Sequence, residues 1–142
     1  LNTEDGEDEA YFSHFPAHSL YFYDPAGNVV EFISRHSIAK ESEEPFSPQS
    51  ILNISEMSLT VEDAIETGRK LKKLGIKERN DHPISGSSLH FMSDNATSPF
   101  LLLIQPGRRW IFSDKIAAIH PIDIELSTND RIVVTDNNEL VI

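Results

Sequence analysis

Three glutamates, each set in an apolar stretch, are the residues of this chain most suited to chemistry. Glu31 lies in a short aliphatic run. Apolar and polar residues alternate over residues 51–61 and over residues 117–127, and Glu56 and Glu125 occupy polar positions within these two segments. Strand alternation places each carboxylate on the face opposite its core-forming neighbours. A charge there is costly unless a metal, a cation or water accompanies it.

Three carboxylates and no imidazole form an oxygen-rich set of candidate ligands. Such a set favours hard divalent ions such as Mg²⁺ or Mn²⁺ over Zn²⁺. Without a metal, three carboxylates facing one another would repel. The alternative is that one or more of them pairs with Arg or Lys, or faces water on the open side of a sheet.

The composition excludes several classes of protein. The 142 residues include 23 acidic and 12 basic side chains, a net charge of −11, which argues against nucleic acid as a partner because phosphate binding needs clustered Lys and Arg. The chain has no cysteine, so we expect neither disulfides nor thiolate metal sites, and a cytoplasmic location. No apolar run is long enough to span a bilayer, so no membrane partner is expected.

The start of the chain is acidic and polar. Residues 1–9 lack the basic and apolar parts of a signal peptide, and no Met opens the sequence. We therefore expect a fragment of a longer protein. The chain also lacks a Ser-His-Asp order, a P-loop, a dinucleotide fingerprint and a zinc-protease motif.

The elements that position Glu31 form a predicted hairpin at about residues 18–34. His18 to Tyr23 is rich in aromatic residues with high strand propensity, and strand character resumes at Val29. Between them, Asp24 to Asn28 contains Pro and Gly in an arrangement typical of a tight turn. Residues 37–50 are polar, with several Glu and two Pro, and are predicted to be a linker.

The elements that position Glu56 and Glu125 lie in residues 51–127. Strands are predicted at 51–61, 89–92, 100–105 and 117–127, with a helix at 62–74 whose apolar residues recur at helical spacing. The order is therefore β-α-β-β-β. Residues 128–142 are predicted to add a C-terminal hairpin that turns at Asp136 to Asn138.

The run Asp24-Pro25-Ala26-Gly27-Asn28-Val29-Val30-Glu31-Phe32 resembles the motif D-P-x-G-N-x-x-E-(F/L) of the vicinal oxygen chelate superfamily, which includes glyoxalases, bleomycin-resistance proteins and ring-cleaving dioxygenases. The resemblance implies an α+β fold in which βαβββ modules form a curved mixed sheet around a cavity. Residues 51–127 would be one complete module. Residues 1–36 would be the last strands of a first module that is incomplete in this chain.

The same resemblance implies roles for individual residues. Glu31 matches a metal-ligand position of the first module, and Glu125 matches the last-strand position of the second. Glu56 precedes Asp63 by seven residues, where the family usually has a ligand, often His, and it would ligate or act as a base. The cofactor would be a divalent metal, namely Mg, Mn, Fe or Zn. The fourth ligand position lies outside this chain.

Other residues extend the candidate site. His18 begins the motif strand, where a His of the family reaches the cavity, so the resemblance implies a catalytic or ligand role. His14 and His18 are four positions apart, but Pro16 prevents a common helix. Arg108 and Trp110 follow a Pro-Gly turn and are candidates for an anion-binding or stacking lip that contacts substrate. The alternative is a surface turn with Trp110 half-buried.

Three functions are compatible with the sequence. The first is a metal-dependent lyase, isomerase or dioxygenase acting on a small molecule with vicinal oxygens. The second is a metal-free protein of the same fold that sequesters a small molecule. The third is a structural or regulatory domain without a ligand. The truncated first module leaves a sheet edge open, so we expect a homodimer.

Overall fold

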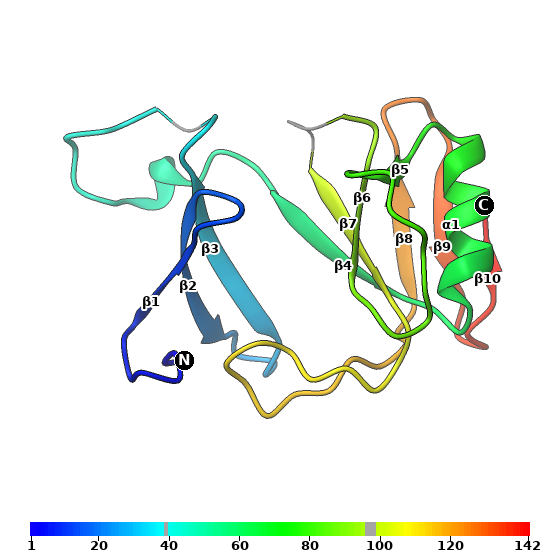
Figure 1. Cartoon of the computed structure of the whole chain (residues 1–142), viewed down its shortest axis with the longest axis horizontal. Coiled ribbons are helices and arrows are strands. Elements are labelled where there is room, and N and C mark those ends of the chain that lie inside the picture. The colour runs from blue at the N-terminus through cyan, green and yellow to red at the C-terminus, as the bar shows by residue number, and fades with distance from the viewer. Residues whose placement is uncertain (39, 96–98) are drawn as a thin grey trace. The chain divides into compact units, whose positions relative to one another are not determined.

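The computed structural model describes residues 1–38, 40–95 and 99–142. Residue 39 of the predicted linker and residues 96–98 of the predicted module lie outside the described residues. The fold is of the α+β class: the described residues form one α-helix, one short 3-10 helix η1 (Pro48–Ser50) and ten strands in three sheets (Figure 1). Within the described ranges, no helix is long and apolar enough to cross a membrane.

The chain divides into two compact units, which we describe separately. Unit 1 comprises residues 1–53 and 109–115, and unit 2 comprises residues 54–108 and 116–142. The segment 109–115 therefore packs with the N-terminal strands although it follows most of unit 2 in the sequence.

Unit 1 contains the predicted hairpin and one further strand. Its three antiparallel strands are arranged in the order β1-β2-β3 and are β1 (Glu9–Phe12), β2 (Ala17–Tyr23) and β3 (Val29–Arg35). The register between the last two strands pairs Tyr21 with Glu31 and His18 with Ser34.

The turn from β2 to β3 fixes this register. The Asp24 carboxylate accepts hydrogen bonds from the backbone N–H of Ala26 at 2.9 Å and of Asn28 at 2.8 Å. Gly27 has a φ of +85°, a conformation that glycine adopts without the steric cost of a Cβ atom. The dense turn chemistry predicted from residues 24–28 is thus present as a network centred on Asp24.

Unit 2 begins with a β-α-β-β-β run. Its elements are β4 (Glu56–Thr60), α1 (Ala64–Lys73), β5 (Lys77–Glu78), β6 (His90–Ser93) and β7 (Phe100–Ile104). The strands form a sheet in the order β4-β7-β6-β5, in which β4 runs parallel to β7 and the other pairs are antiparallel. A parallel pair needs a crossover, and the segment containing α1 is part of that crossover.

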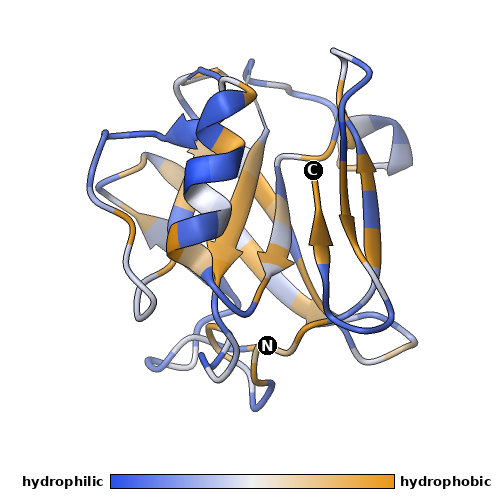
Figure 2. Cartoon of the chain, turned by 90° about the vertical axis from the view of Figure 1, so that its right-hand side faces the viewer, coloured by the Kyte–Doolittle hydropathy of each residue, from blue (hydrophilic) through white to orange (hydrophobic). Residues whose placement is uncertain are grey.

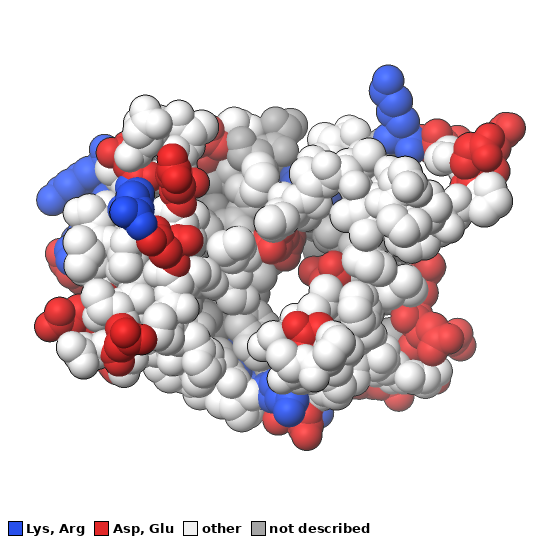
Figure 3. All heavy atoms as spheres, turned by 180° about the vertical axis from the view of Figure 1, so that it is seen from behind, with Lys and Arg blue, Asp and Glu red and all other residues white. Residues whose placement is uncertain are grey.

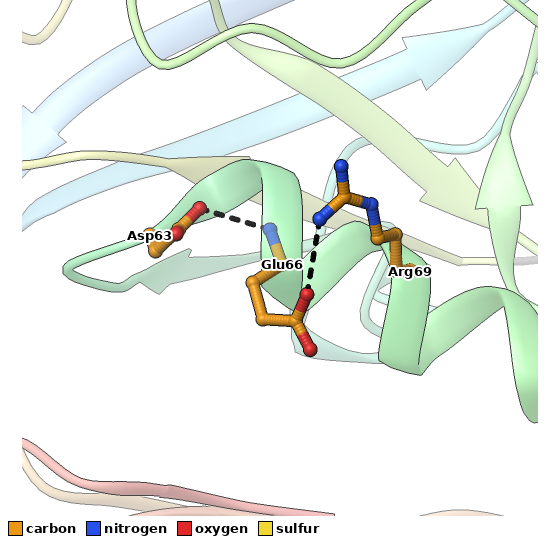
Figure 4. Close-up of polar contacts among 3 residues, drawn as sticks. All are labelled: Asp63, Glu66 and Arg69. Atoms are coloured by element: carbon orange, nitrogen blue, oxygen red, sulfur yellow. Dashed lines mark hydrogen bonds and ion pairs between the residues drawn. The ribbon is translucent and has the colours of Figure 1, made fainter.

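The first turn of α1 is capped by a side chain. Asp63 is the N-cap, and its carboxylate accepts a hydrogen bond from the backbone N–H of Glu66 at 2.9 Å (Figure 4). Arg69 donates to the Glu66 carboxylate at 3.2 Å, one turn further along. The helix starts two residues later than predicted because Asp63 takes the extended cap conformation. It ends before Gly75, whose φ is +82°.

The C-terminal strands form a separate sheet. Strands β8 (Ile122–Glu125), β9 (Arg131–Val134) and β10 (Leu140–Val141) are antiparallel in the order β10-β9-β8. The strand predicted at 117–127 is therefore shorter. It pairs with β9 and does not close the four-stranded sheet. Pro121 has no backbone N–H to donate, so strand pairing begins only after it. The predicted C-terminal hairpin is present, with Asn138 at a φ of +64° in its turn.

One hydrophobic core joins α1 and both sheets of unit 2. Leu71 of α1 is fully buried in a cluster of helix, strand and loop residues, whose other members are Leu59, Val61, Ala64, Ile76, Met92, Leu103, Ile132 and Val134. The predicted partners Ile122, Ile124 and Leu126 pack around this cluster, and Met57 is half-buried. Figure 2 shows mainly hydrophobic strands and a mainly hydrophilic outward face of α1. This burial supplies the principal driving force for folding of unit 2.

Candidate functional site

The Glu31 carboxylate is held by a tyrosine on the neighbouring strand. Tyr21 lies directly opposite Glu31, and its hydroxyl donates a hydrogen bond to the Glu31 Oε1 atom at 2.6 Å. Both side chains are half-buried. A charged acceptor makes this a short and strong hydrogen bond, which fixes the direction of the carboxylate. Strand alternation and the hairpin motif predicted Glu31 as a candidate ligand but gave no sign of this partner.

The segment 109–115 packs on the same face of the sheet as Glu31. The ring of Phe112 meets that of Tyr21 edge-on, with a centroid distance of 5.4 Å. The Tyr23 hydroxyl donates to the Asp114 Oδ1 atom at 2.6 Å, and this bond is the main cause that lowers the pKa of Asp114. Sequence reasoning did not single out Phe112 or Asp114, because their contacts with residues 21 and 23 span about 90 positions and leave no local pattern.

Arg108 and Trp110 flank the start of this segment. The Arg108 side chain is exposed, and its carbonyl accepts a hydrogen bond from Ala117 at 2.7 Å. Trp110 is half-buried in a turn in which its carbonyl accepts from the Ser113 hydroxyl at 3.0 Å. Trp110 thus has the burial that the surface-turn alternative expects. The substrate-binding role of Arg108 and Trp110 stays a prediction.

His18 lies on the opposite face of the unit 1 sheet from Glu31. Glu31 pairs with Tyr21, which is three positions after His18 on β2, and residues an odd number of positions apart on a strand face opposite sides. The His18 ring contacts His36 and Tyr11 rather than the side chains around Glu31. Within unit 1, the sheet therefore does not bring the predicted catalytic histidine and the predicted metal ligand together.

Glu56 lies on the face of the four-stranded sheet opposite the helix-facing core. It pairs with Phe100 at the start of β7, and it is half-buried. Alternation puts it on the other side of β4 from the core residue Leu59, as the sequence predicted. The predicted ligand position is therefore on a strand face that α1 leaves uncovered.

Two aromatic rings and a guanidinium group lie on the face of the four-stranded sheet that carries Glu56. The Phe91 and Phe100 rings meet edge-on at 5.7 Å, and the Arg79 guanidinium lies 4.1 Å from the Phe91 centroid. The Arg79 backbone N–H donates to the carbonyl of Phe91, which holds the residue beside β6. Such an arrangement can bind a planar or anionic group of a ligand. Sequence reasoning missed Arg79 because β5, directly before it, consists of only two residues with no apolar pattern.

Glu125 is at the end of β8 and is exposed. It pairs with Arg131, whose pKa is raised mainly by its hydrogen bond and ion pair with Asp123 and, to a smaller extent, by Glu125. This surface pairing agrees with the alternative in which a candidate ligand has a basic neighbour. Glu125 and Glu56 belong to different sheets of unit 2.

A metal site needs several ligand side chains close to one point. In the ranges 1–38, 40–95 and 99–142, no group of three or more His, Cys, Asp or Glu side chains has the geometry to hold a metal ion. Carboxylate oxygens are suitable donors for a hard divalent ion. Glu31, Glu56 and Glu125 as metal ligands, and Glu56 and His18 as catalytic residues, therefore stay predictions.

Two further surface features bear on ligand binding. A groove of about 160 Å³ lies at the start of α1, beside Glu66, Lys70 and Asn138. It is smaller than the several hundred Å³ typical of a small-molecule site. On the face shown in Figure 3, acidic side chains outnumber basic ones. This charge distribution disfavours anionic ligands away from the few local cations such as Arg79.

One family model matches the chain. Residues 54–108, which contain the run from β4 to β7, match the family described as toxoflavin-degrading enzyme. No significant match to a curated protein was found. The toxoflavin-degrading family belongs to the vicinal oxygen chelate superfamily, so the match agrees at that level with the resemblance of the hairpin motif in unit 1. Residues 54–108 are thus similar to a glyoxalase- and dioxygenase-like enzyme domain.

Proposed function

We propose that this chain is a glyoxalase- and dioxygenase-like domain that binds a small molecule and transforms it with the help of a divalent metal. The observation that carries the proposal is the family match over residues 54–108, which coincides with the β-α-β-β-β run and its parallel pairing of β4 with β7. The hairpin motif that ends in Glu31 supports it independently, because it lies outside the matched residues.

The residues of unit 2 would bind and orient the substrate. Phe91 offers a half-buried ring, and Arg79 is placed to attract an oxygen that gains negative charge. Glu56 lies at the edge of the same face and would accept a proton from the substrate as a general base. Lyase, isomerase and dioxygenase reactions of vicinal oxygens share this need for a base and a stabilised oxyanion.

Glu31 of unit 1 is the metal-ligand candidate that the hairpin motif implies. Glu31 is fixed by Tyr21, so its remaining oxygen has a defined direction, as a metal ligand requires. A bound divalent ion would act as a Lewis acid on two vicinal oxygens of the substrate. Tyr21 is a positioning residue in this scheme, because it acts through Glu31.

The proposal is tested with toxoflavin as the substrate, since the matched family is named for its degradation. Chelator-treated protein is supplied with Mg²⁺, Mn²⁺, Fe²⁺ or Zn²⁺, and loss of toxoflavin is followed. We expect metal-dependent turnover that falls by about 100-fold in Glu31→Gln and in Glu56→Gln. The matched control is Glu44→Gln, an exposed carboxylate of the linker, which should retain full turnover. Absence of turnover with every metal would contradict the enzyme function.

The second candidate is a metal-free protein that sequesters the same class of molecule. One observation favours it: the Phe91 and Phe100 rings and the Arg79 guanidinium form a surface that can contact a small molecule without a metal. Melting curves distinguish the two functions, because a ligand that binds the folded state raises the midpoint as its concentration exceeds its dissociation constant. A midpoint raised by toxoflavin in the presence of EDTA, without turnover, would establish the sequestering protein.

We also propose that the chain forms a homodimer. In unit 1, β1 and β3 are the outer strands of a three-stranded sheet, and unpaired strand edges favour association. Light scattering over the micromolar range should report twice the mass of 16.0 kDa. A compact species with the monomer mass of 16.0 kDa at every concentration would contradict the dimer.

A further inference from the structure

Two histidines of unit 1 converge on the sheet face opposite Glu31. The Nδ1 atom of His18 and the Nε2 atom of His36 are 2.7 Å apart, and the ring centroids are 4.7 Å apart. Tyr11 stacks beside them, with its centroid 4.8 Å from that of His18. The hairpin resemblance implies a role for His18 alone, and neither it nor the family match assigns a function to His36 or to the pair.

The backbone places both rings. His18 lies within β2, and His36 follows the last residue of β3 directly. The backbone N–H of His36 donates to the carbonyl of Pro16 at 2.9 Å, which continues the pairing of these strands into the turn. The two imidazoles are therefore cross-strand neighbours held by hydrogen-bonded backbone, and His36 is exposed.

The short distance between the nitrogens constrains their protons. Two ring nitrogens at hydrogen-bonding distance share one proton, so at least one of them presents a lone pair to the other. The Glu9 carboxylate lies 3.5 Å from the other nitrogen of His18, Nε2, and favours a proton there. The Nδ1 atom of His18 then carries the lone pair. In metal sites, a carboxylate that accepts from one ring nitrogen of a histidine orients the other nitrogen toward the metal in the same way.

We propose that His18 and His36 form a bis-imidazole site for a borderline divalent transition metal, with Glu9 as a positioning residue. Bonds of about 2.1 Å at a tetrahedral ion hold two nitrogens about 3.4 Å apart, so the exposed His36 ring has to move outward by less than about 1 Å. Imidazole ligands favour Cu²⁺, Ni²⁺ and Zn²⁺, with Cu²⁺ bound most tightly. No third side chain of the described residues joins the pair, so water completes the coordination.

The first test is calorimetric titration of chelator-treated full chain with Ni²⁺. We expect one tightly bound Ni²⁺ ion per chain at this site, and a loss of at least tenfold in its affinity in His18→Ala/His36→Ala. The matched control His14→Ala/His120→Ala removes two other imidazoles, both exposed, and should bind Ni²⁺ as the wild type does. Unchanged affinity in the first variant, or an equal loss in both, would overturn the site.

Two further measurements keep the test decisive if the variant folds poorly. In the wild type, substoichiometric Cu²⁺ should broaden the imidazole NMR signals of His18 and His36 before those of the other four histidines. Equal broadening of all six would overturn the site. Glu9→Gln should weaken Ni²⁺ binding by about tenfold without changing the stoichiometry. Glu31→Gln should leave Ni²⁺ binding unchanged, which separates this site from the carboxylate ligands of the proposed enzyme.

Discussion

The two units of the chain are stabilised by different interactions. Unit 2 buries a cluster of aliphatic side chains around Leu71 and Leu103, between α1 and two sheets. Unit 1 buries mainly small or polar side chains, such as Ala17, Ser19 and Arg35. The Ser19 hydroxyl is fully enclosed and has no hydrogen-bond partner among the described residues. Aliphatic burial thus accounts for much less of the stability of unit 1.

Polar contacts of aromatic and turn residues replace this burial in unit 1. The hydroxyls of Tyr21 and Tyr23 donate hydrogen bonds to Glu31 and Asp114. The Asp24 carboxylate accepts the hydrogen bonds that hold the turn between β2 and β3. Each such bond contributes a modest net free energy, whereas a buried leucine contributes several kcal/mol. Truncation in the core should therefore damage unit 2 most, and deletion of single polar groups should be detectable mainly in unit 1.

The largest effect is expected for Leu71→Ala, which leaves a cavity in the core of unit 2. Leu71 is fully buried, so the loss of unfolding free energy should be about 2–5 kcal/mol. Urea denaturation followed by far-ultraviolet circular dichroism measures the change, because the signal reports α1. Ile65→Ala on the exposed side of the same helix is the control and should cost much less.

The same variant sharpens the comparison if a second probe is used. Trp110 is the only tryptophan of the sequence and belongs to unit 1, so its fluorescence reports that unit. We expect Leu71→Ala to shift the dichroism transition more than the fluorescence transition. Equal shifts would mean that the units unfold together and that their stabilities are not separate.

Gly68→Ala should have the next largest effect. A Cβ atom at residue 68 would lie 2.1 Å from the Cδ1 atom of Ile84, so that side chain must move. Overpacking of this kind costs about 1–3 kcal/mol, which exceeds the gain of about 1 kcal/mol in helix propensity. Ile84→Val removes the clashing methyl group. In that background Gly68→Ala should be neutral or stabilising, and an unchanged loss would contradict the packing explanation.

A smaller effect is expected for Tyr21→Phe in unit 1. The change removes the hydroxyl that donates to Glu31, and it should cost about 1 kcal/mol. Trp110 fluorescence during denaturation measures it. Tyr11→Phe is the matched control, since the hydroxyl of this exposed residue makes no hydrogen bond within the described residues. A Tyr21→Phe effect no larger than that of the control would show that the bond to Glu31 is not stabilising.

The smallest effect is a shift in the titration of Asp24. Its pKa lies below the ordinary 3.8, first because the Asn28 side chain donates to the carboxylate and then because backbone N–H groups do so. A lowered pKa in the folded state stabilises unit 1 above about pH 3.8, and this stabilisation is lost as the pH falls through the lowered pKa.

Asn28→Ala should therefore raise the pKa of Asp24 toward its ordinary value. Titration of the carboxyl carbon by NMR measures the pKa, and Asn53→Ala at an exposed position is the control. A pKa that does not change in Asn28→Ala would assign the shift to the backbone groups alone.

Local patterns predicted those elements whose signals lie within a few residues. The hairpin of residues 18–34 follows from turn chemistry at 24–28, and α1 follows from helical spacing of Ile65, Gly68 and Leu71. The pairing of strands was not accessible in this way. β5 has two residues and carries no periodicity, and the sheet membership of residues 122–125 depends on partners that alternation does not identify.

The candidate site was predicted residue by residue but not as an arrangement. Strand alternation correctly placed Glu56 on the face of β4 opposite the core residue Leu59. Glu31 was assigned from alternation and the motif, and His18 from the family resemblance. Only the register between β2 and β3 shows that they face opposite sides. The contacts of Phe112 and Asp114 with β2 depend on the return of the chain to unit 1 between the two segments of unit 2, which no short-range pattern records.

The parallel pairing of β4 with β7 has a consequence for the speed of folding. Glu56 meets Phe100, 44 positions later, whereas β6 and β7 are close neighbours in the sequence. Closing the longer loop costs more chain entropy and becomes easier once α1 and the β6–β7 pair have shortened it. Docking of β4 would then be a late event. Substitutions at Leu59 would mainly accelerate unfolding, and those at Met92 or Leu103 would mainly slow folding.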